Sequence, residues 1–62
     1  MKHDRGLEKA IKAAGGTRAL AAKLGIKHQA ISQWRRIPLA RLLDVEKASG
    51  VRREELRPEL YR

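Results

Sequence analysis

The stretch that decides the fold is TRALAAKLGIKHQAISQWRR, residues 17–36, in which two short apolar patterns are separated by a single glycine, Gly25. Five residues of this stretch are Lys or Arg and none is acidic. The pattern predicts two helices joined by a tight turn. Its charge raises the question of whether one face of the pair binds something negatively charged.

The first half of the stretch predicts a helix over residues 17–24, with the Thr17 hydroxyl as its cap and with Leu20 and Leu24 on its inner side. Gly25 ends this helix, because glycine enters the left-handed region without a Cβ penalty. Ile26 follows the glycine and can fold back on the last helical turn.

The second half predicts a helix over residues 28–36. At 100° per residue, Ala30, Ile31 and Trp34 share one arc of about 100°, which we expect to face the core. The opposite side carries a polar stripe, and two further polar residues flank it; the stripe is Gln29, Ser32, Gln33 and Arg36, and the flanking residues are His28 and Arg35. Gln pairs bidentately with adenine and Arg with guanine, so the stripe suits base recognition, although an ordinary solvated face is an equally good interpretation of the stripe alone.

The two helices must cross closely at Ala21, four residues before Gly25, because a larger side chain there would push their axes apart. The residues that we expect to form the core of this motif are Leu20, Ala21, Leu24, Gly25, Ile26, Ile31 and Trp34. Their spacing is that of a helix-turn-helix unit over about residues 17–36, whose second helix protrudes far enough to enter a major groove about 12 Å wide.

The flanking sequence predicts further helices. Leu7, Ala10, Ile11 and Ala14 follow one helix face, with Asp4 as the cap and Gly15-Gly16 as the stop. After the motif, Pro38 suits the first turn of a helix over residues 38–49, to which Leu39, Leu42, Leu43, Val45 and Ala48 supply apolar area before Gly50 ends it. A short helical turn over residues 53–56 stops before Pro58. We therefore expect one all-α domain over residues 1–62, with four to five short helices around one core.

Composition narrows the classes of partner. The 62-residue chain carries 15 basic and 7 acidic residues, a net charge of +8, and no acidic residue lies between Glu8 and Asp44. Such segregation favours an anionic partner, most often nucleic acid, over a merely basic surface. The absence of cysteine excludes disulfides, and with His3 and His28 as the only imidazoles we expect no metal and no cofactor. No apolar run is long enough for a membrane span or a signal peptide, so we expect a cytoplasmic protein without membrane contact.

An enzyme is not expected. Ser32, His28 and Asp44 supply the side chains of a hydrolytic triad, but the first two lie on one exposed helix without a pocket or an oxyanion donor. A chain of this length also has little material for a cavity that would hold a small-molecule substrate.

The segments GGTRALAAKLGIKHQAISQW, IPLARLLDVEKASG and VRREELRPELY together resemble small regulators of the phage Cro type, and more narrowly the YdaS-like group of Cro homologues and proposed antitoxins. The resemblance covers nearly the whole chain and implies a lambda-repressor-like fold. It also implies base contacts by His28, Gln29, Ser32 and Gln33, with Lys27 at the helix entrance. Thr17 would place its hydroxyl and nearby backbone N–H groups against a phosphate.

Two positions depart from the family pattern. Gln is frequent where this chain has Thr17, so a side-chain bridge from that residue toward the bases is not expected. Ser is frequent in the family where this chain has Lys27. The helix over residues 28–36 therefore lacks a side-chain cap worth about 1 kcal/mol and has instead a positive charge beside the DNA backbone.

These observations predict a transcriptional regulator, a repressor that binds operator half-sites in double-stranded DNA through the major groove. Base contacts are assigned to His28, Gln29, Ser32, Gln33 and Arg36, and phosphate contacts to Thr17, Arg18, Lys23, Lys27 and Arg35. A homodimer that forms at least on DNA is expected, in the cytoplasm of a bacterial or phage-infected cell. The alternative is an antitoxin-like protein-interaction module that binds a toxin partner and, as an open option, its own promoter. Leu60 and Tyr61 are candidates for a dimer or partner surface, whereas Val51 and Leu56 are expected to close the core.

Overall fold

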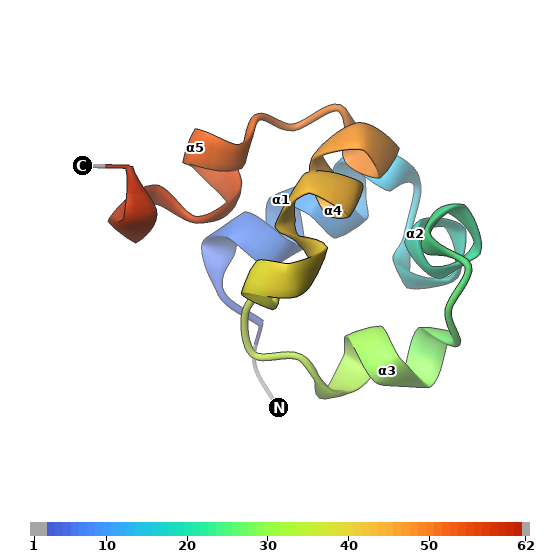
Figure 1. Ribbon diagram of the computed structural model, residues 1–62. Helices are drawn as coiled ribbons and strands as arrows, with labels where there is room; N and C mark the ends of the chain where they lie inside the picture. The colour runs from blue at the N-terminus through green and yellow to red at the C-terminus, as the bar shows by residue number, and fades with distance from the viewer. Residues whose placement is uncertain (1–2, 62) are drawn as a thin grey trace.

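Five α-helices and two short 3-10 turns make up the regular structure of residues 3–61, the part of the chain that the computed structural model describes (Figure 1). In chain order they are α1 (Arg5–Ala14), α2 (Thr17–Leu24), α3 (His28–Gln33), η1 (Leu39–Arg41), α4 (Leu42–Ser49), α5 (Arg53–Leu56) and η2 (Pro58–Leu60). No strand occurs within residues 3–61, so the predicted all-α class is confirmed. None of the helices in this part of the chain is long and apolar enough to cross a bilayer.

The boundaries of α1 follow the predicted signals. The Asp4 carboxylate accepts a hydrogen bond of 2.9 Å from the Leu7 backbone N–H, which makes Asp4 the N-cap. At the other end Gly15 adopts the left-handed conformation with φ 99°, and the Gly16 N–H donates back to the Ile11 carbonyl at 2.8 Å. Thr17 differs from the prediction, because Gly16 is the cap of α2 and Thr17 is its first helical residue, without a capping bond from its hydroxyl.

The helix α3 is shorter than predicted, ending at Gln33 rather than at residue 36. Trp34 has an extended backbone with ψ 133°, and its N–H closes a tight last turn on the Ile31 carbonyl at 3.0 Å. Two features farther along explain the early end. Pro38 disfavours a helical conformation for Ile37, and Ile37 is fully buried, so the chain leaves the helix in order to insert this side chain into the core.

The core lies between α1, α2, α4 and α5, with α1 and α4 crossing in the middle and α2 and α5 on opposite sides of them (Figure 1). Its buried apolar members are Leu7, Ala10, Ala14, Leu20, Ala21, Ile31, Ile37, Leu42, Val45 and Leu56. Leu24, Ile26, Trp34 and Val51 are half-buried and pack against this core. The helix α3 packs chiefly on α2, and its residues Gln29, Ser32 and Gln33 are exposed.

Two of the leucines expected to supply apolar area to the helix over residues 38–49 lie in solvent. Leu39 is 66% exposed and Leu43 is 53% exposed. The prediction placed both on one continuous helix, whereas the 3-10 turn η1 precedes α4. Leu42 and Val45 are the buried residues of this region, and the half-buried Ala48 packs against the core beside them.

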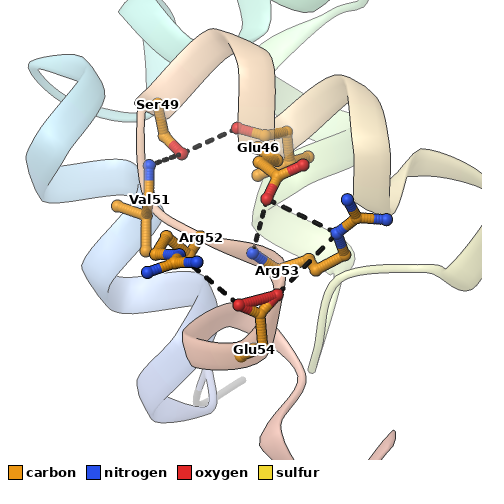
Figure 2. A network of polar contacts seen from close by, with 7 residues as sticks. Glu46, Ser49, Val51, Arg52, Arg53 and Glu54 are labelled. Carbon is orange, nitrogen blue, oxygen red and sulfur yellow. Dashed lines mark hydrogen bonds and ion pairs between the residues drawn. The ribbon is translucent and has the colours of Figure 1, made fainter. Parts of the chain in front are cut away.

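The junction between α4 and α5 is held by polar side chains (Figure 2). The Glu46 carboxylate accepts a hydrogen bond of 2.8 Å from the Arg53 backbone N–H, so a side chain of α4 caps the first turn of α5. The Ser49 hydroxyl donates to the Val45 carbonyl at 2.7 Å and accepts from the Val51 N–H at 3.1 Å. These bonds set the direction of the chain between the two helices.

Candidate nucleic-acid interface

The turn between α2 and α3 fixes the angle of the helix pair. Gly25 has φ 71° and ψ 30°, and its N–H donates to the Ala22 carbonyl at 3.2 Å, while the Ile26 N–H donates to the Ala21 carbonyl at 3.0 Å. This pair of bonds ends α2 in the Schellman manner. An added Cβ at Gly25 would meet no atom within 4 Å, so glycine is required there by its positive φ and not by lack of space.

The helix α3 has one buried and one open side. Ile31 is fully buried, and Ala30 and His28 are half-buried. Gln29, Ser32 and Gln33 are exposed on the other side, as the predicted stripe requires. Within residues 3–61 neither glutamine amide takes part in a hydrogen bond, and the Ser32 hydroxyl donates to the His28 carbonyl at 3.2 Å while keeping its lone pairs free. This face therefore offers donors and acceptors to an external partner.

A shallow hollow of about 420 Å³ lies between α2, the turn that follows it and the start of α3. Its polar lining comes from Arg18, Lys27, His28 and Gln29, and no acidic side chain lines it. The structure thus brings two predicted phosphate contacts beside two predicted base contacts. An anion that enters this hollow meets the positive charge of Arg18 on α2 and of Lys27 directly before α3.

Three of the predicted phosphate contacts lie elsewhere. Lys23 lines a separate hollow with Asp44 and Lys47 on the side of α2 that faces α4. Arg35 lies in the segment after α3, next to Asp4 and His3. Thr17 is half-buried at the start of α2.

Arg36 is not part of the helical stripe on which its prediction depended. Since α3 ends at Gln33, Arg36 sits in the connecting segment, where it is exposed. The carboxylate of Glu59 lies near Arg36. The pKa of this carboxyl is lowered chiefly by the hydrogen bond from the Arg57 guanidinium, and the charge of Arg36 adds a smaller effect in the same direction. The acid-free stretch of sequence gave no sign of this approach, because Glu59 reaches it only through the fold.

The segment after α3 is fixed at two points. The Arg35 carbonyl accepts a hydrogen bond of 2.8 Å from the Asp4 N–H, and the Ile37 carbonyl accepts one of 2.7 Å from the Arg57 guanidinium. The two ends of the described chain therefore anchor the end of α3 to the body of the protein.

A sequence model of the family described as "Bacterial toxin YdaS" matches residues 7–62. The chain belongs to this family. Among solved structures, a Cro protein from a prophage element of Xylella fastidiosa strain Ann-1 is 38% identical and superposes with a TM-score of 0.79. The match covers 95% of this YdaS-family chain and 98% of the Cro protein. No curated protein matches the sequence.

These findings confirm the resemblance that the sequence indicated and the Cro-like helix-turn-helix fold that it implied. The family description names a toxin, whereas the alternative considered for the sequence was an antitoxin.

Proposed function

We propose that this protein is a regulator that binds double-stranded DNA sequence-specifically and represses transcription, with α3 inserted in the major groove of an operator half-site. The observation that carries the proposal is the exposed, acid-free polar face of α3 above the buried Ile31, joined to the basic hollow that Arg18 and Lys27 line. The likeness to a Cro protein from a prophage element supports it.

The side chains suit two tasks. We assign base-edge contacts to His28, Gln29, Ser32 and Gln33 at the start and on the open face of α3, while Arg36 would approach the DNA from beyond the end of α3. Arg18 and Lys27 would hold phosphates on either side of the hollow, with Thr17, Lys23 and Arg35 as further phosphate contacts from their separate positions. Such a protein would act in the cytoplasm of a bacterial or phage-infected cell, and it would need no enzymatic activity.

Selection of bound sites from random duplex DNA tests the proposal. We expect a palindromic site whose halves lie about 34 Å apart, one turn of B-DNA. Recovery of no enriched sequence would refute specific binding.

Gln29→Ala separates base recognition from folding. The variant should lose roughly 1–3 kcal/mol of discrimination at one base pair, because a bidentate pair to adenine is removed, while its thermal unfolding stays close to that of the wild type. Fluorescence anisotropy on the selected duplex and on duplexes changed at each position measures this loss. Equal weakening on selected and random DNA would show that Gln29 contacts the backbone instead.

The salt dependence of binding separates phosphate contacts from other charges. Lys27→Gln should reduce the slope of log K against log salt by about 0.9, since one fewer counterion is released. Arg52→Gln is the matched control, because it removes the same charge from a residue on the α5 side whose side chain is 80% exposed. Equal slopes for both variants would contradict the role given to Lys27.

The second candidate function is a module that binds a protein partner, a toxin if the chain is an antitoxin. Leu60 and Tyr61 favour this function, because both are large hydrophobic residues at the end of the described chain and both are exposed to solvent. The exposed fraction is 44% for Leu60 and 45% for Tyr61. If site selection yields no enriched DNA, this function becomes the better account, and Tyr61→Ser would then be expected to weaken capture of the partner.

A further inference from the structure

The segment that follows α3 is held by a side chain from the C-terminal part of the chain. The Arg57 guanidinium donates through Nη1 to the Ile37 carbonyl at 2.7 Å and through Nε to the Glu59 carboxylate. The Arg57 side chain is 11% exposed, whereas the other basic side chains that form ion pairs within residues 3–61 are between 46% and 80% exposed. We infer that Arg57 and Glu59 are positioning residues for DNA recognition, because together they fix the end of α3; the inference rests on the proposed function.

The end of α3 depends on this segment for its support. The helix packs chiefly on α2, and the turn at Gly25 and the buried Ile31 hold its start and its middle. After its last residue the chain is extended, so the direction of the last turn follows the path of residues 34–38. That path is set by the buried Ile37 side chain and by the bonds that the Arg35 and Ile37 carbonyls accept.

The position of Arg57 is itself well determined. Its N–H donates to the Arg53 carbonyl at 2.9 Å at the end of α5, and its carbonyl accepts from the Leu60 N–H at 3.0 Å in η2. The bond from its guanidinium to Glu59 is charge-assisted and therefore of the stronger kind, and it lowers the pKa of the Glu59 carboxyl, which keeps the pair ionised at neutral pH. Because the donors of a guanidinium form a rigid planar fork, the bond at Nε also directs Nη1 toward the Ile37 carbonyl.

Loss of this guanidinium would release the end of α3. Within residues 3–61 the Ile37 carbonyl accepts no other hydrogen bond, and it belongs to a fully buried residue, so it would have to move toward water to regain a partner. Such a movement displaces residues 34–38 and with them the last turn of α3, which carries Gln33. Gln29 lies one turn nearer to the fixed turn at Gly25 and would be displaced less. Arg57 and Glu59 therefore act on the direction of α3 and not on DNA itself.

Arg57→Gln tests the inference. Fluorescence anisotropy on the duplex recovered by site selection and on random duplex DNA measures the ratio of the two affinities. This ratio should fall about tenfold, comparable to the loss of one correctly recognised base pair. Arg52→Gln is the matched control, because it removes the same charge from a side chain that is 80% exposed, and it should leave the ratio unchanged. An unchanged ratio in Arg57→Gln would overturn the inference.

The salt dependence on random DNA shows whether Arg57 touches a phosphate. The slope of log K against log salt should be the same for Arg57→Gln and Arg52→Gln, since neither variant removes a phosphate contact. A slope reduced by about 0.9 in Arg57→Gln alone would make Arg57 a phosphate contact and would contradict the positioning role.

Glu59→Gln separates positioning from simple electrostatics, and it keeps the inference testable if Arg57→Gln does not fold. Removal of a negative charge near Arg36 should by itself strengthen binding to all DNA. If Glu59 holds Arg57, the variant should bind random DNA at least as well as the wild type and yet lose part of its preference for the selected duplex. Glu54→Gln, which changes a carboxylate of α5 that pairs with Arg52, should alter both affinities alike. Equal strengthening on both duplexes by Glu59→Gln would show that Glu59 acts through its charge alone, against the inference.

The base pairs affected distinguish support of α3 from general loosening. On duplexes changed at each position, and well below the Tm of each variant, Arg57→Gln should lose discrimination at the base pair that Gln33→Ala identifies. It should keep discrimination at the base pair that Gln29→Ala identifies. Equal losses at both would show that the whole motif loosens and would refute the positioning role. A wild type without preference for any sequence over random DNA would instead refute the proposed function.

Discussion

Gly6→Ala tests how closely α1 and α5 approach each other. Gly6 is a buried residue in the first turn of α1. A Cβ at this position would lie 2.0 Å from the Leu56 carbonyl oxygen and 2.7 Å from its carbon. Both atoms belong to the backbone of α5, so no side-chain rotation relieves the overlap. The helices would have to separate by about 1.4 Å, the difference between that 2.0 Å and an ordinary contact of 3.4 Å.

The change in the free energy of unfolding of Gly6→Ala is the sum of one favourable and two unfavourable contributions. Alanine gains up to about 1 kcal/mol over glycine within a helix, and less near its start. Overpacking costs about 1–3 kcal/mol, and moving α5 outward withdraws part of Leu56, whose full burial is worth about 1.5–3 kcal/mol. We therefore expect a net loss of about 2 kcal/mol. This is a large fraction of the few kcal/mol expected for so small a domain.

Thermal unfolding followed by far-UV circular dichroism measures this loss. For a domain of this size 1 kcal/mol corresponds to a change in Tm of about 4–8 °C, so the variant should melt about 8–16 °C below the wild type. Ala13→Gly in the exposed part of α1 is the control, because it reports the glycine–alanine difference without a steric term. A Gly6→Ala variant as stable as the wild type, or more stable by the amount that Ala13→Gly loses, would refute the close approach.

Two further predictions concern stability. Trp34→Ala should lower the free energy of unfolding by about 2 kcal/mol, as measured by urea titration followed by circular dichroism. This is less than the 3–5 kcal/mol typical of a fully buried aromatic residue, because Trp34 is half-buried. A loss within 0.5 kcal/mol, the ordinary range for surface substitutions, would show that Trp34 is peripheral. Acid should lower the Tm: hydrogen bonds from Lys9 to Glu55 and from Arg57 to Glu59 hold the pKa of both carboxyls below the ordinary 4.5. Their ionised forms therefore stabilise the folded state above that value, and the effect is lost as the pH falls through the lowered folded pKa. Glu55→Gln should make the Tm fall less between about pH 6 and pH 3, and an unchanged fall would contradict the contribution of its pair.

The sequence was sufficient to predict the helix ends that depend on local chemistry. Asp4 caps α1, and Gly15, Gly25 and Gly50 each end a helix in the left-handed conformation. These signals act within one helical turn, so no knowledge of the tertiary structure is needed to interpret them. The same holds for the two faces of α3, because helical periodicity alone assigns Ile31 to the core.

Features that depend on distant contacts were not predictable from the pattern. The early end of α3 results from the burial of Ile37. The helical periodicity of the sequence does not determine which of several apolar residues is buried in a small core. Gly6 carries no turn signal, since its requirement comes from the backbone of α5, fifty residues away in sequence. The exposure of Leu39 and Leu43 likewise depends on how η1 turns before α4.

The charge segregation along the sequence persists in three dimensions around the hollow that Arg18 and Lys27 line, whereas acidic residues lie near Lys23, Arg35 and Arg36. The ion pairs within residues 3–61 join the acidic residues of α4, α5 and η2 to basic residues of α1 and the C-terminal third, as in Lys9–Glu55 and Arg53–Glu46. None of these pairs includes Arg18 or Lys27, so positive charge stays uncompensated beside the open face of α3. A surface selected only for solubility would gain from distributing its acids over both sides. The basic side of this molecule instead retains its self-repulsion, a cost that binding to a polyanion removes.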